Sequence, residues 1–321
     1  MEQKKPLIVL SGPTAVGKTK LSLALAKAIG GEIISADSMQ VYKHMDIGSA
    51  KIKPEEMEGV PHHLIDVLEP EEEFNVVIFQ KLCKEAMEGI YKRGHIPILT
   101  GGTGFYIQAV LYDIDFTEND GDISYREELE ALAKEQGSEY LHQMLFFVDE
   151  KSAEAIHPNN TKRIIRALEF AHQTHEPISA HNEEQRSREG PYASCYFVLT
   201  DDRDKLYARI DKRVEEMLSE GLFDEVKKLK ARGCTRNMVS MQGLGYKELL
   251  AHLEGEISLD EAVYRIKRDT RHFAKRQLTW FKREKEVIWY HKGEFGYDEE
   301  AILKDMVDRI TRCINKNEDH I

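Results

Sequence analysis

The sequence has few cysteines and no long apolar run, and each shortage excludes a class of protein. Four cysteines are scattered over 321 residues, at positions 83, 195, 234 and 313. With no C-x-x-C pair among them, neither a disulfide framework nor a zinc site is indicated. No apolar run approaches the roughly 18 to 20 residues that would span a bilayer. We therefore expect a protein of the reducing cytoplasm that has no membrane partner.

Basic residues are also in the minority. The formal net charge is −12, which argues at first sight against a nucleic-acid partner. The bases are nevertheless gathered in two stretches, at 162–166 and 265–285. In the second stretch they alternate with aromatic residues, as on surfaces that follow a phosphate backbone. An acidic chain with two basic stripes can still bind a polyanion locally.

The chain does contain a phosphate-binding loop near its start. Residues 11–19 read Ser-Gly-Pro-Thr-Ala-Val-Gly-Lys-Thr, between an apolar run and an Ala- and Leu-rich helical pattern. The glycines let the backbone turn its N–H groups inward at a helix N-terminus, where phosphate oxygens bind. Lys18 would lie against the phosphates, and the hydroxyl of Thr19 is placed to hold Mg²⁺. The predicted phosphate-binding residues are Gly12, Pro13, Thr14, Ala15, Val16, Gly17, Lys18 and Thr19.

Short apolar runs alternate with helical patterns in much of the chain, which predicts an α/β fold with a parallel sheet. Strands are expected at 7–10, 32–35, 60–70, 96–99, 196–199 and 287–290. Ligands bind at the carboxyl ends of such strands, where Asp37 is either a functional carboxylate or a turn cap. The Gly-Gly-Thr-Gly turn at 101–104 permits close approach to a ligand, or is a plain turn. Arg209 and Arg213, on a helix expected at 207–220, can point towards the phosphate site.

From about residue 115 the pattern becomes entirely helical. Helices are expected at 123–136, 139–147, 150–157 and 160–174, with no strand among them. The last of these carries cations on one face and apolar residues on the other. We therefore expect a P-loop NTPase-like parallel sheet flanked by helices, formed by residues 1–114 and 191–321, and an inserted all-helical domain at 115–190.

Three function classes use such a loop. A hydrolytic NTPase requires an aspartate at the end of such a strand for a magnesium contact. The strand expected at 96–99 is instead followed by Thr100 and glycines. A P-loop small-molecule kinase stays open, although it needs no broad basic helix. In the third class, the loop holds a departing diphosphate while carbon is transferred to a nucleophile.

Motifs in order along nearly the whole chain resemble those of the tRNA dimethylallyltransferase family. They are Gly-Pro-Thr-Ala-Val-Gly-Lys-Thr at 12–19, Ile-Ser-Ala-Asp-Ser-Met-Gln-Val-Tyr at 34–42, Met-Asp-Ile-Gly-Ser-Ala-Lys at 45–51, Gly-Gly-Thr-Gly-Phe-Tyr at 101–106, Lys-Arg-Ile-Ile-Arg-Ala-Leu-Glu at 162–169, Leu-Gly-Tyr-Lys-Glu at 244–248 and Ala-Lys-Arg-Gln-Leu-Thr-Trp at 274–280. The resemblance implies transfer of a dimethylallyl group from its diphosphate to N6 of the adenosine at tRNA position 37, on the 3′ side of the anticodon.

The resemblance also implies roles for particular residues. Asp37 resembles the general base at the amino nitrogen, and Lys18, Thr19 and Arg213 resemble a diphosphate clamp. The residues that resemble tRNA contacts are Asp37, Ser38, Met39, Gln40, Thr103, Arg126, Lys162, Arg163, Ile164, Ile165, Arg166, Gln242, Gly243, Leu244, Gly245, Tyr246 and Lys247.

The implied partners are the anticodon stem-loop of tRNA and dimethylallyl diphosphate, with Mg²⁺ as cofactor, and we expect a monomer. The alternatives are a related transferase that acts on free adenine nucleotide and, from another class, a nucleotide-gated RNA-binding module without turnover. The free-nucleotide enzyme would need neither basic stripe, and the RNA-binding module would leave Asp37 idle.

Overall fold

The computed structural model describes residues 4–116, 123–187 and 190–318. The chain divides into two compact units, one made of residues 1–111 and 191–321 and the other of residues 112–190. We call the first unit the core and the second the insert. The insert begins three residues before the boundary at 115 that the sequence suggests. None of the described helices combines the length and the apolar character needed to cross a membrane.

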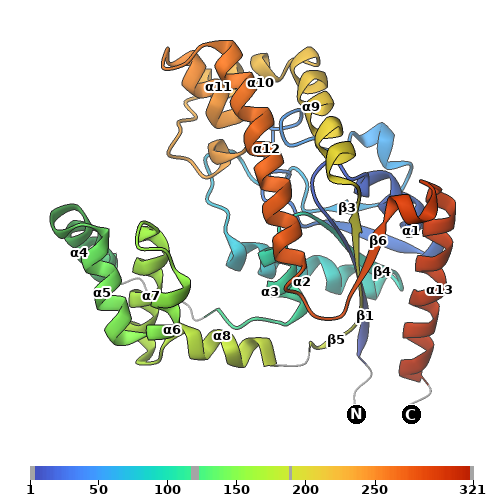
Figure 1. The fold of residues 1–321 in the computed structure, drawn as a ribbon. Coiled ribbons are helices and arrows are strands. Elements are labelled where there is room, and N and C mark those ends of the chain that lie inside the picture. The colour runs from blue at the N-terminus through green and yellow to red at the C-terminus, as the bar shows by residue number, and fades with distance from the viewer. Residues whose placement is uncertain (1–3, 117–122, 188–189, 319–321) are drawn as a thin grey trace. The chain divides into compact units, whose positions relative to one another are not determined.

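The core is built on a six-stranded sheet (Figure 1). Its strands are β1 (Lys5–Ser11), β2 (Gly31–Ser35), β3 (His62–His63), β4 (Ile96–Gly101), β5 (Tyr192–Thr200) and β6 (Val287–His291). They lie in the order β3-β2-β4-β1-β5-β6, and every pair of neighbours is parallel. Successive residues 7–10 of β1, which point to opposite faces of the sheet, are all buried, and burial on both faces explains the continuous apolar run. The expected α/β class with a P-loop on a parallel sheet is confirmed.

Helices pack on both faces of this sheet (Figure 1). The helices of the core are α1 (Lys18–Ile29), α2 (Val76–Lys92), α3 (Gly104–Leu111), α9 (Arg203–Ser219), α10 (Leu222–Ala231), α11 (Tyr246–Leu253), α12 (Leu259–Phe281) and α13 (Glu299–Glu318), with short 3₁₀ turns η1 (Pro54–Met57), η2 (Ser240–Gln242) and η3 (Lys292–Phe295). Local signals set several helix ends. Asn75 caps α2 by accepting the N–H groups of Val77 and Ile78, and Gly30 ends α1 in the left-handed conformation.

The insert is entirely helical among its described residues. Its helices are α4 (Ile123–Gln136), α5 (Ser138–Val148), α6 (Glu150–Ala155), α7 (Thr161–Thr174) and α8 (Ile178–Ser187). It has a small apolar core of its own, which includes Leu129, Leu141, Leu145, Ile164 and Leu168. The four helices expected from the sequence are confirmed to within two residues at each end.

Several elements differ from their expected bounds. Helix α9 begins at Arg203, four residues before its expected start, and β3 covers only two residues of the stretch expected at 60–70. Helix α8 was not expected, because its stretch is polar and has no clear apolar period; the carboxylate of Asp149 accepts the N–H of Ser179 and holds its start. Strand β5 starts four residues early, since its first half pairs with β1 although Ala193 and Ser194 favour strands weakly. Helix α12 ends at Phe281, whereas the sequence pattern predicts a helix over 258–286.

Candidate functional site

The P-loop joins β1 to α1 at the carboxyl edge of the sheet. Gly12 has φ +145°, and a Cβ there would lie 2.5 Å from the carbonyl oxygen of Leu199. Gly17 has φ +100° and is the residue before α1. Both positions therefore need glycine, one for close approach to β5 and the other for the left-handed turn into the helix. The predicted loop geometry is present.

Lys18 is the first residue of α1, and its side chain folds back into the loop. Its Nζ donates hydrogen bonds to the carbonyl oxygens of Gly12 and Pro13, at 3.0 and 2.9 Å. The pKa of Lys18 is lowered to about 8, chiefly by burial and then by the positive charge of Arg213, with the carboxylate of Asp37 opposing both. The ammonium group thus lies where phosphate oxygens would meet it, in surroundings that already hold a second cation.

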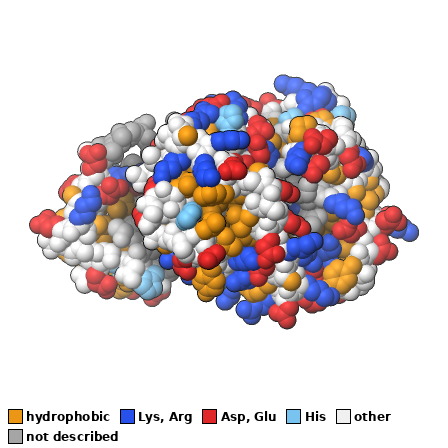
Figure 2. Space-filling view, turned by 90° about the horizontal axis from the view of Figure 1, so that it is seen from above, with side chains coloured by type: hydrophobic (Ala, Val, Ile, Leu, Met, Phe, Trp, Pro, Cys, Tyr) orange, Lys and Arg blue, Asp and Glu red, His pale blue; other side chains and the backbone are white. Residues whose placement is uncertain are grey.

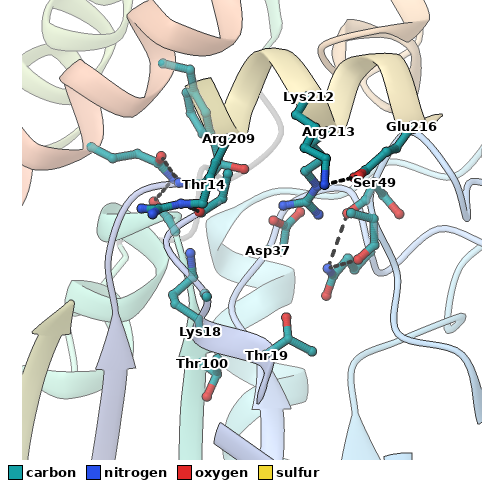
Figure 3. A pocket seen from close by; sticks show the side chains of 18 residues that line it. Thr14, Lys18, Thr19, Asp37, Ser49, Thr100, Arg209, Lys212, Arg213 and Glu216 are labelled. Carbon is teal, nitrogen blue, oxygen red and sulfur yellow. Dashed lines mark hydrogen bonds and ion pairs between the residues drawn. The ribbon is translucent and has the colours of Figure 1, made fainter. Parts of the chain in front are cut away.

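A pocket of about 380 Å³ opens above the loop. Thr14, Lys18, Thr19, Asp37, Thr100, Arg213 and Gln277 are among its lining residues. Asp37 follows β2, whereas Arg213 comes from α9, and Figure 3 shows their side chains pointing towards one another. Asp37 Oδ1 also accepts the N–H of Met39 at 2.8 Å. The two readings of Asp37 are therefore compatible, because the carboxylate caps a turn and still faces the pocket.

The two predicted arginines of α9 lie differently. Arg213 is half-buried beside Asp37, and burial lowers its pKa while Asp37 opposes the shift. Arg209 also lines the pocket, but its guanidinium donates to the carbonyl of Ala15 at 3.0 Å and pairs with Asp201 at 2.7 Å. The guanidinium of Arg209 is therefore engaged by the P-loop backbone and by Asp201. Arg213 is the cation of α9 that faces Asp37.

Gln277 of α12 is a site residue that was not predicted, although it lies within the motif at 274–280 that carries part of the family resemblance. Its Oε1 accepts the N–H of Thr14 at 2.9 Å, and its Nε2 donates to the carbonyl of Gly102 at 3.0 Å. A Cβ on Gly102 would lie 2.0 Å from that Nε2. One buried amide thus joins the P-loop to the glycine turn after β4. The turn at 101–104 consequently makes a close approach to protein, with Thr103 on the wall of the neighbouring cavity.

An adjoining cavity of about 320 Å³ is more apolar. It shares Thr14, Asp37 and Arg213 with the first pocket. Its apolar wall comes from α9, α10 and α12 and contains Ile210, Val214, Met217, Leu222, Ile266 and Phe273. A polar pocket lined by four cationic side chains and an apolar cavity therefore meet at Asp37 and Arg213.

Hard oxygen donors suit Mg²⁺, which keeps few protein ligands and completes its shell with water and phosphate oxygens. The hydroxyl of Thr19 and the carboxylate of Asp37 both line the phosphate pocket, so the residues present fit that ion. Asp201, Asp202 and His291 form another cluster of metal-ligand type. There, however, Asp201 already accepts from Tyr297 and pairs with Arg209.

The predicted tRNA-contact residues of the core gather around the apolar cavity. Ser38, Met39, Thr103, Gln242, Gly243, Leu244, Gly245 and Lys247 line it. Gln40 instead lines the phosphate pocket. The prediction that Tyr246 contacts tRNA is wrong for its side chain. That side chain is fully buried, and its hydroxyl donates to Glu225 at 2.7 Å. That tyrosine packs inside the core and has no surface to offer RNA.

Of the tRNA contacts predicted in the insert, some residues are exposed and others are buried. Lys162 and Arg163 are exposed on α7. Ile164 and Ile165 are wrong as contacts, since both side chains are buried in the core of the insert. Arg126 makes two 2.8 Å bonds to the buried carboxylate of Glu169, and so ties α4 to α7. The remaining predicted residue, Arg166, is half-buried on α7.

The basic stripe on α12 is shorter than the sequence suggests. In its first half, Arg265, Lys267, Arg268 and Arg271 pair with the acids Glu261, Glu215, Asp269 and Asp211. In its second half, a groove of about 460 Å³ is lined by His272, Lys275, Arg276, Thr279, Trp280 and Arg283. Acidic and basic side chains are mixed over the core in Figure 2. The second half thus places Lys275, Arg276 and Arg283 in one groove with Trp280, whereas in the first half Arg268 lies over the ring of Tyr264.

Comparisons with known proteins identify relatives over nearly the whole chain. A family model described as IPP transferase matches residues 40–284, and one described as isopentenyl transferase matches residues 5–71. A tRNA dimethylallyltransferase of Lachnoclostridium phytofermentans is 64% identical over 96% of this chain and 98% of its own.

Solved structures are similar as well. A tRNA isopentenylpyrophosphate transferase of Bacillus halodurans has a TM-score of 0.74 and 44% identity, over 99% of this chain and 100% of its own. A eukaryotic dimethylallyltransferase described as acting on tRNA has a TM-score of 0.78 and 31% identity, over 89% of this chain and 74% of its own. With a P-loop, a facing carboxylate and relatives of this identity, the chain belongs to the IPP transferase family, the family of the tRNA dimethylallyltransferases.

Proposed function

We propose that the protein transfers a dimethylallyl group from dimethylallyl diphosphate to N6 of the adenosine at tRNA position 37, giving N6-isopentenyladenosine and diphosphate. The observation that carries this proposal is the position of Asp37. Its carboxylate stands where the cationic phosphate pocket and the apolar cavity meet. A donor with a diphosphate at one end and a hydrocarbon at the other matches that pair of surfaces.

The diphosphate of the donor would bind in the P-loop. The loop amides, Lys18 and Arg213 would stabilise the negative charge that develops on the departing oxygen, which is the usual source of rate in such a site. Mg²⁺ held by the hydroxyl of Thr19 would supply further charge neutralisation. The dimethylallyl group would lie against the apolar wall that includes Val214 and Phe273.

The amino group of adenine is a poor nucleophile and becomes cationic on attack. The N6–C1 bond forms, the C1–O bond to the diphosphate breaks, and the surplus N6 proton passes to the carboxylate of Asp37. The base must leave its stack to reach this carboxylate, at about a few kcal/mol, and less in a loop than in a duplex. The cations of α7 and of the second half of α12 would supply tRNA binding that offsets this cost.

The closest competing function is prenylation of free adenine nucleotide. Labelled dimethylallyl diphosphate, offered with either anticodon stem-loop RNA or AMP, separates the two activities. The tRNA proposal expects label in the RNA; label in AMP alone would replace it with the competitor, and no transfer to either would favour a binding module.

The role of Asp37 is tested with Asp37→Asn, which keeps the shape of the side chain and removes the base. We expect turnover to fall by about 10²- to 10⁴-fold, with the dissociation constant for tRNA unchanged within about twofold. Asp308→Asn on α13, an exposed position outside both pockets, is the matched control. Normal turnover of Asp37→Asn would remove this residue as the base.

A further inference from the structure

One carboxylate holds a segment that lies more than 170 residues before it in the chain. Glu225 of α10 accepts the backbone N–H groups of Asp46, Ile47 and Gly48, at 3.0, 2.8 and 3.2 Å. It also accepts the hydroxyl of Tyr246 at 2.7 Å. A carboxylate offers about four acceptor sites, so this one is filled by protein donors alone.

Tyr246 completes the arrangement from α11. Its side chain is fully buried, and burial, followed by the charge of Glu225, raises its pKa well above the usual range. The phenol therefore remains a hydrogen-bond donor. A Cβ on Gly48 would lie 2.6 Å from the ring, so the close approach of ring and backbone requires glycine at this position. We call Glu225, Tyr246 and residues 46–48 the latch.

The segment continues directly into the wall of the site. Gly48, Ser49 and Ala50 line the apolar cavity, and the last two also line the phosphate pocket. The side-chain amide of Gln40 donates to the carbonyls of Ser49 and Ala50, both at 3.3 Å. Gln40 is in turn held by the hydroxyl of Ser35 at 2.8 Å.

Gln40 stands three residues after Asp37 in the same turn. A continuous series of bonds therefore runs from Glu225 through residues 46–50 to the segment that carries Asp37. This series also gives a physical reason for the pairing of two motifs of the sequence, at 45–51 and 244–248, which meet where the ring of Tyr246 packs against Gly48. They are the two sides of one contact.

We infer that Glu225 is a positioning residue, which together with Tyr246 fixes the pocket wall at residues 48–50 and so sets the place of the acceptor base relative to Asp37. This inference rests on the proposed function. In this inference Tyr246 contributes to the reaction through its buried hydrogen bond to Glu225 and makes no contact with RNA.

The test compares Glu225→Gln, Tyr246→Phe and the double variant in the full-length protein, with labelled dimethylallyl diphosphate and an anticodon stem-loop. Glutamine keeps the size of the side chain but turns an N–H₂ group towards N–H donors. We expect kcat of Glu225→Gln to fall by about 10- to 100-fold, the effect of a small misplacement of the reacting groups. Tyr246→Phe, which keeps the ring, loses one bond and about 3- to 10-fold in kcat.

Three further measurements distinguish positioning from general damage. The KM for the donor should stay within about twofold, since the P-loop is not altered. Asp224→Asn, one residue earlier on α10 and paired only with Lys227 among the bonds identified for it, should behave as wild type. In the double variant, Tyr246→Phe should cost little beyond Glu225→Gln, because the shared bond is already lost.

Wild-type kcat in a folded Glu225→Gln variant would overturn the inference, and so would fully additive effects in the double variant. A fall in kcat that only follows a fall in the folded fraction, measured by titrating active sites, would overturn it too. A wild-type protein that never labels the stem-loop would instead overturn the proposed function, and the latch with it.

Discussion

Lys18 shows how the site depends on the protonation state of single residues. Its pKa of about 8 is low for a lysine, chiefly through burial and then through the charge of Arg213. A lysine loses its charge as the pH rises through its pKa. In the free protein, Lys18 is therefore mostly charged at pH 7 and mostly neutral at pH 9, which makes the P-loop a weaker anion site in alkaline solution.

We predict that affinity for dimethylallyl diphosphate falls about tenfold for each pH unit above about 8, as measured by equilibrium titration between pH 6.5 and 9.5. Lys18→Arg retains a positive charge over this range, and although its affinity is expected to be lower, it should not vary in this way. A flat profile for the wild-type protein would show that Lys18 does not set the affinity.

Gln277 is a second residue whose role depends on its exact chemistry. It accepts from the N–H of Thr14 and donates to the carbonyl of Gly102, and its amide does both because its oxygen accepts while its nitrogen donates. We predict that Gln277→Met, similar in shape, weakens donor binding by about tenfold, because two buried backbone groups lose their partners at about 1–3 kcal/mol each. Isothermal titration with a non-reactive donor analogue measures this loss.

Another buried glutamine supplies the control for that experiment. Gln80 of α2 donates to the carbonyl of Ala109 at 2.7 Å and lines neither pocket of the site. Gln80→Met should lower the melting temperature as Gln277→Met does, with donor affinity unchanged. Equal affinity losses in both variants would mean that Gln277 contributes stability alone.

At the scale of elements, α7 is the clearest case of one helix with two tasks. Its apolar face forms part of the core of the insert, through Ile164, Ile165 and Leu168. Its first turns present Lys162 and Arg163 to solvent. The amphipathic pattern of the sequence predicted this division correctly, and it also explains why the two isoleucines cannot be RNA contacts.

We predict that Arg163→Ala weakens binding of tRNA and lowers the slope of log K against log salt by about 1, as expected when one phosphate contact is lost. Filter binding between about 50 and 300 mM salt measures that slope. Lys27→Ala, at the end of α1 remote from the P-loop, controls for net charge. If Arg163→Ala and Lys27→Ala show the same slope of log K against log salt, α7 is not part of the RNA-binding surface.

At the scale of the whole molecule, the chain is a core interrupted by a unit with its own interior. The insert encloses buried leucines from α4, α5 and α7. Few residues are available for this interior, so its stability should be modest, about 3–5 kcal/mol. The described contacts nevertheless indicate a unit that closes on itself.

We predict that residues 112–190, expressed alone, form a helical domain that melts cooperatively, as followed by circular dichroism. Leu145→Ala deletes a fully buried side chain of this interior and should cost about 2–5 kcal/mol, enough to abolish the transition. Tyr140→Ala, at a 44% exposed position of the same helix, should leave the cooperative melting transition in place. A non-cooperative melt of the unaltered fragment would mean that the insert needs the core to fold.

The sequence by itself determined the P-loop, the parallel strands around it and the helical insert. These follow from local patterns, since a glycine spacing, an apolar run or a helical period is contained within a few consecutive residues. It also placed Asp37 at the carboxyl edge of the sheet, because topology alone brings the end of every parallel strand there.

Only the tertiary structure decided which side chains complete the site. Gln277 meets Thr14 across 263 positions, and Glu225 meets residues 46–48 across nearly 180. Both lie within ordinary helical patterns, and such long-range hydrogen bonds leave no local trace. The same reason removed Tyr246, Ile164 and Ile165 from the predicted RNA surface: burial is a property of the packed chain, and a motif specifies which residues recur but not which way they face.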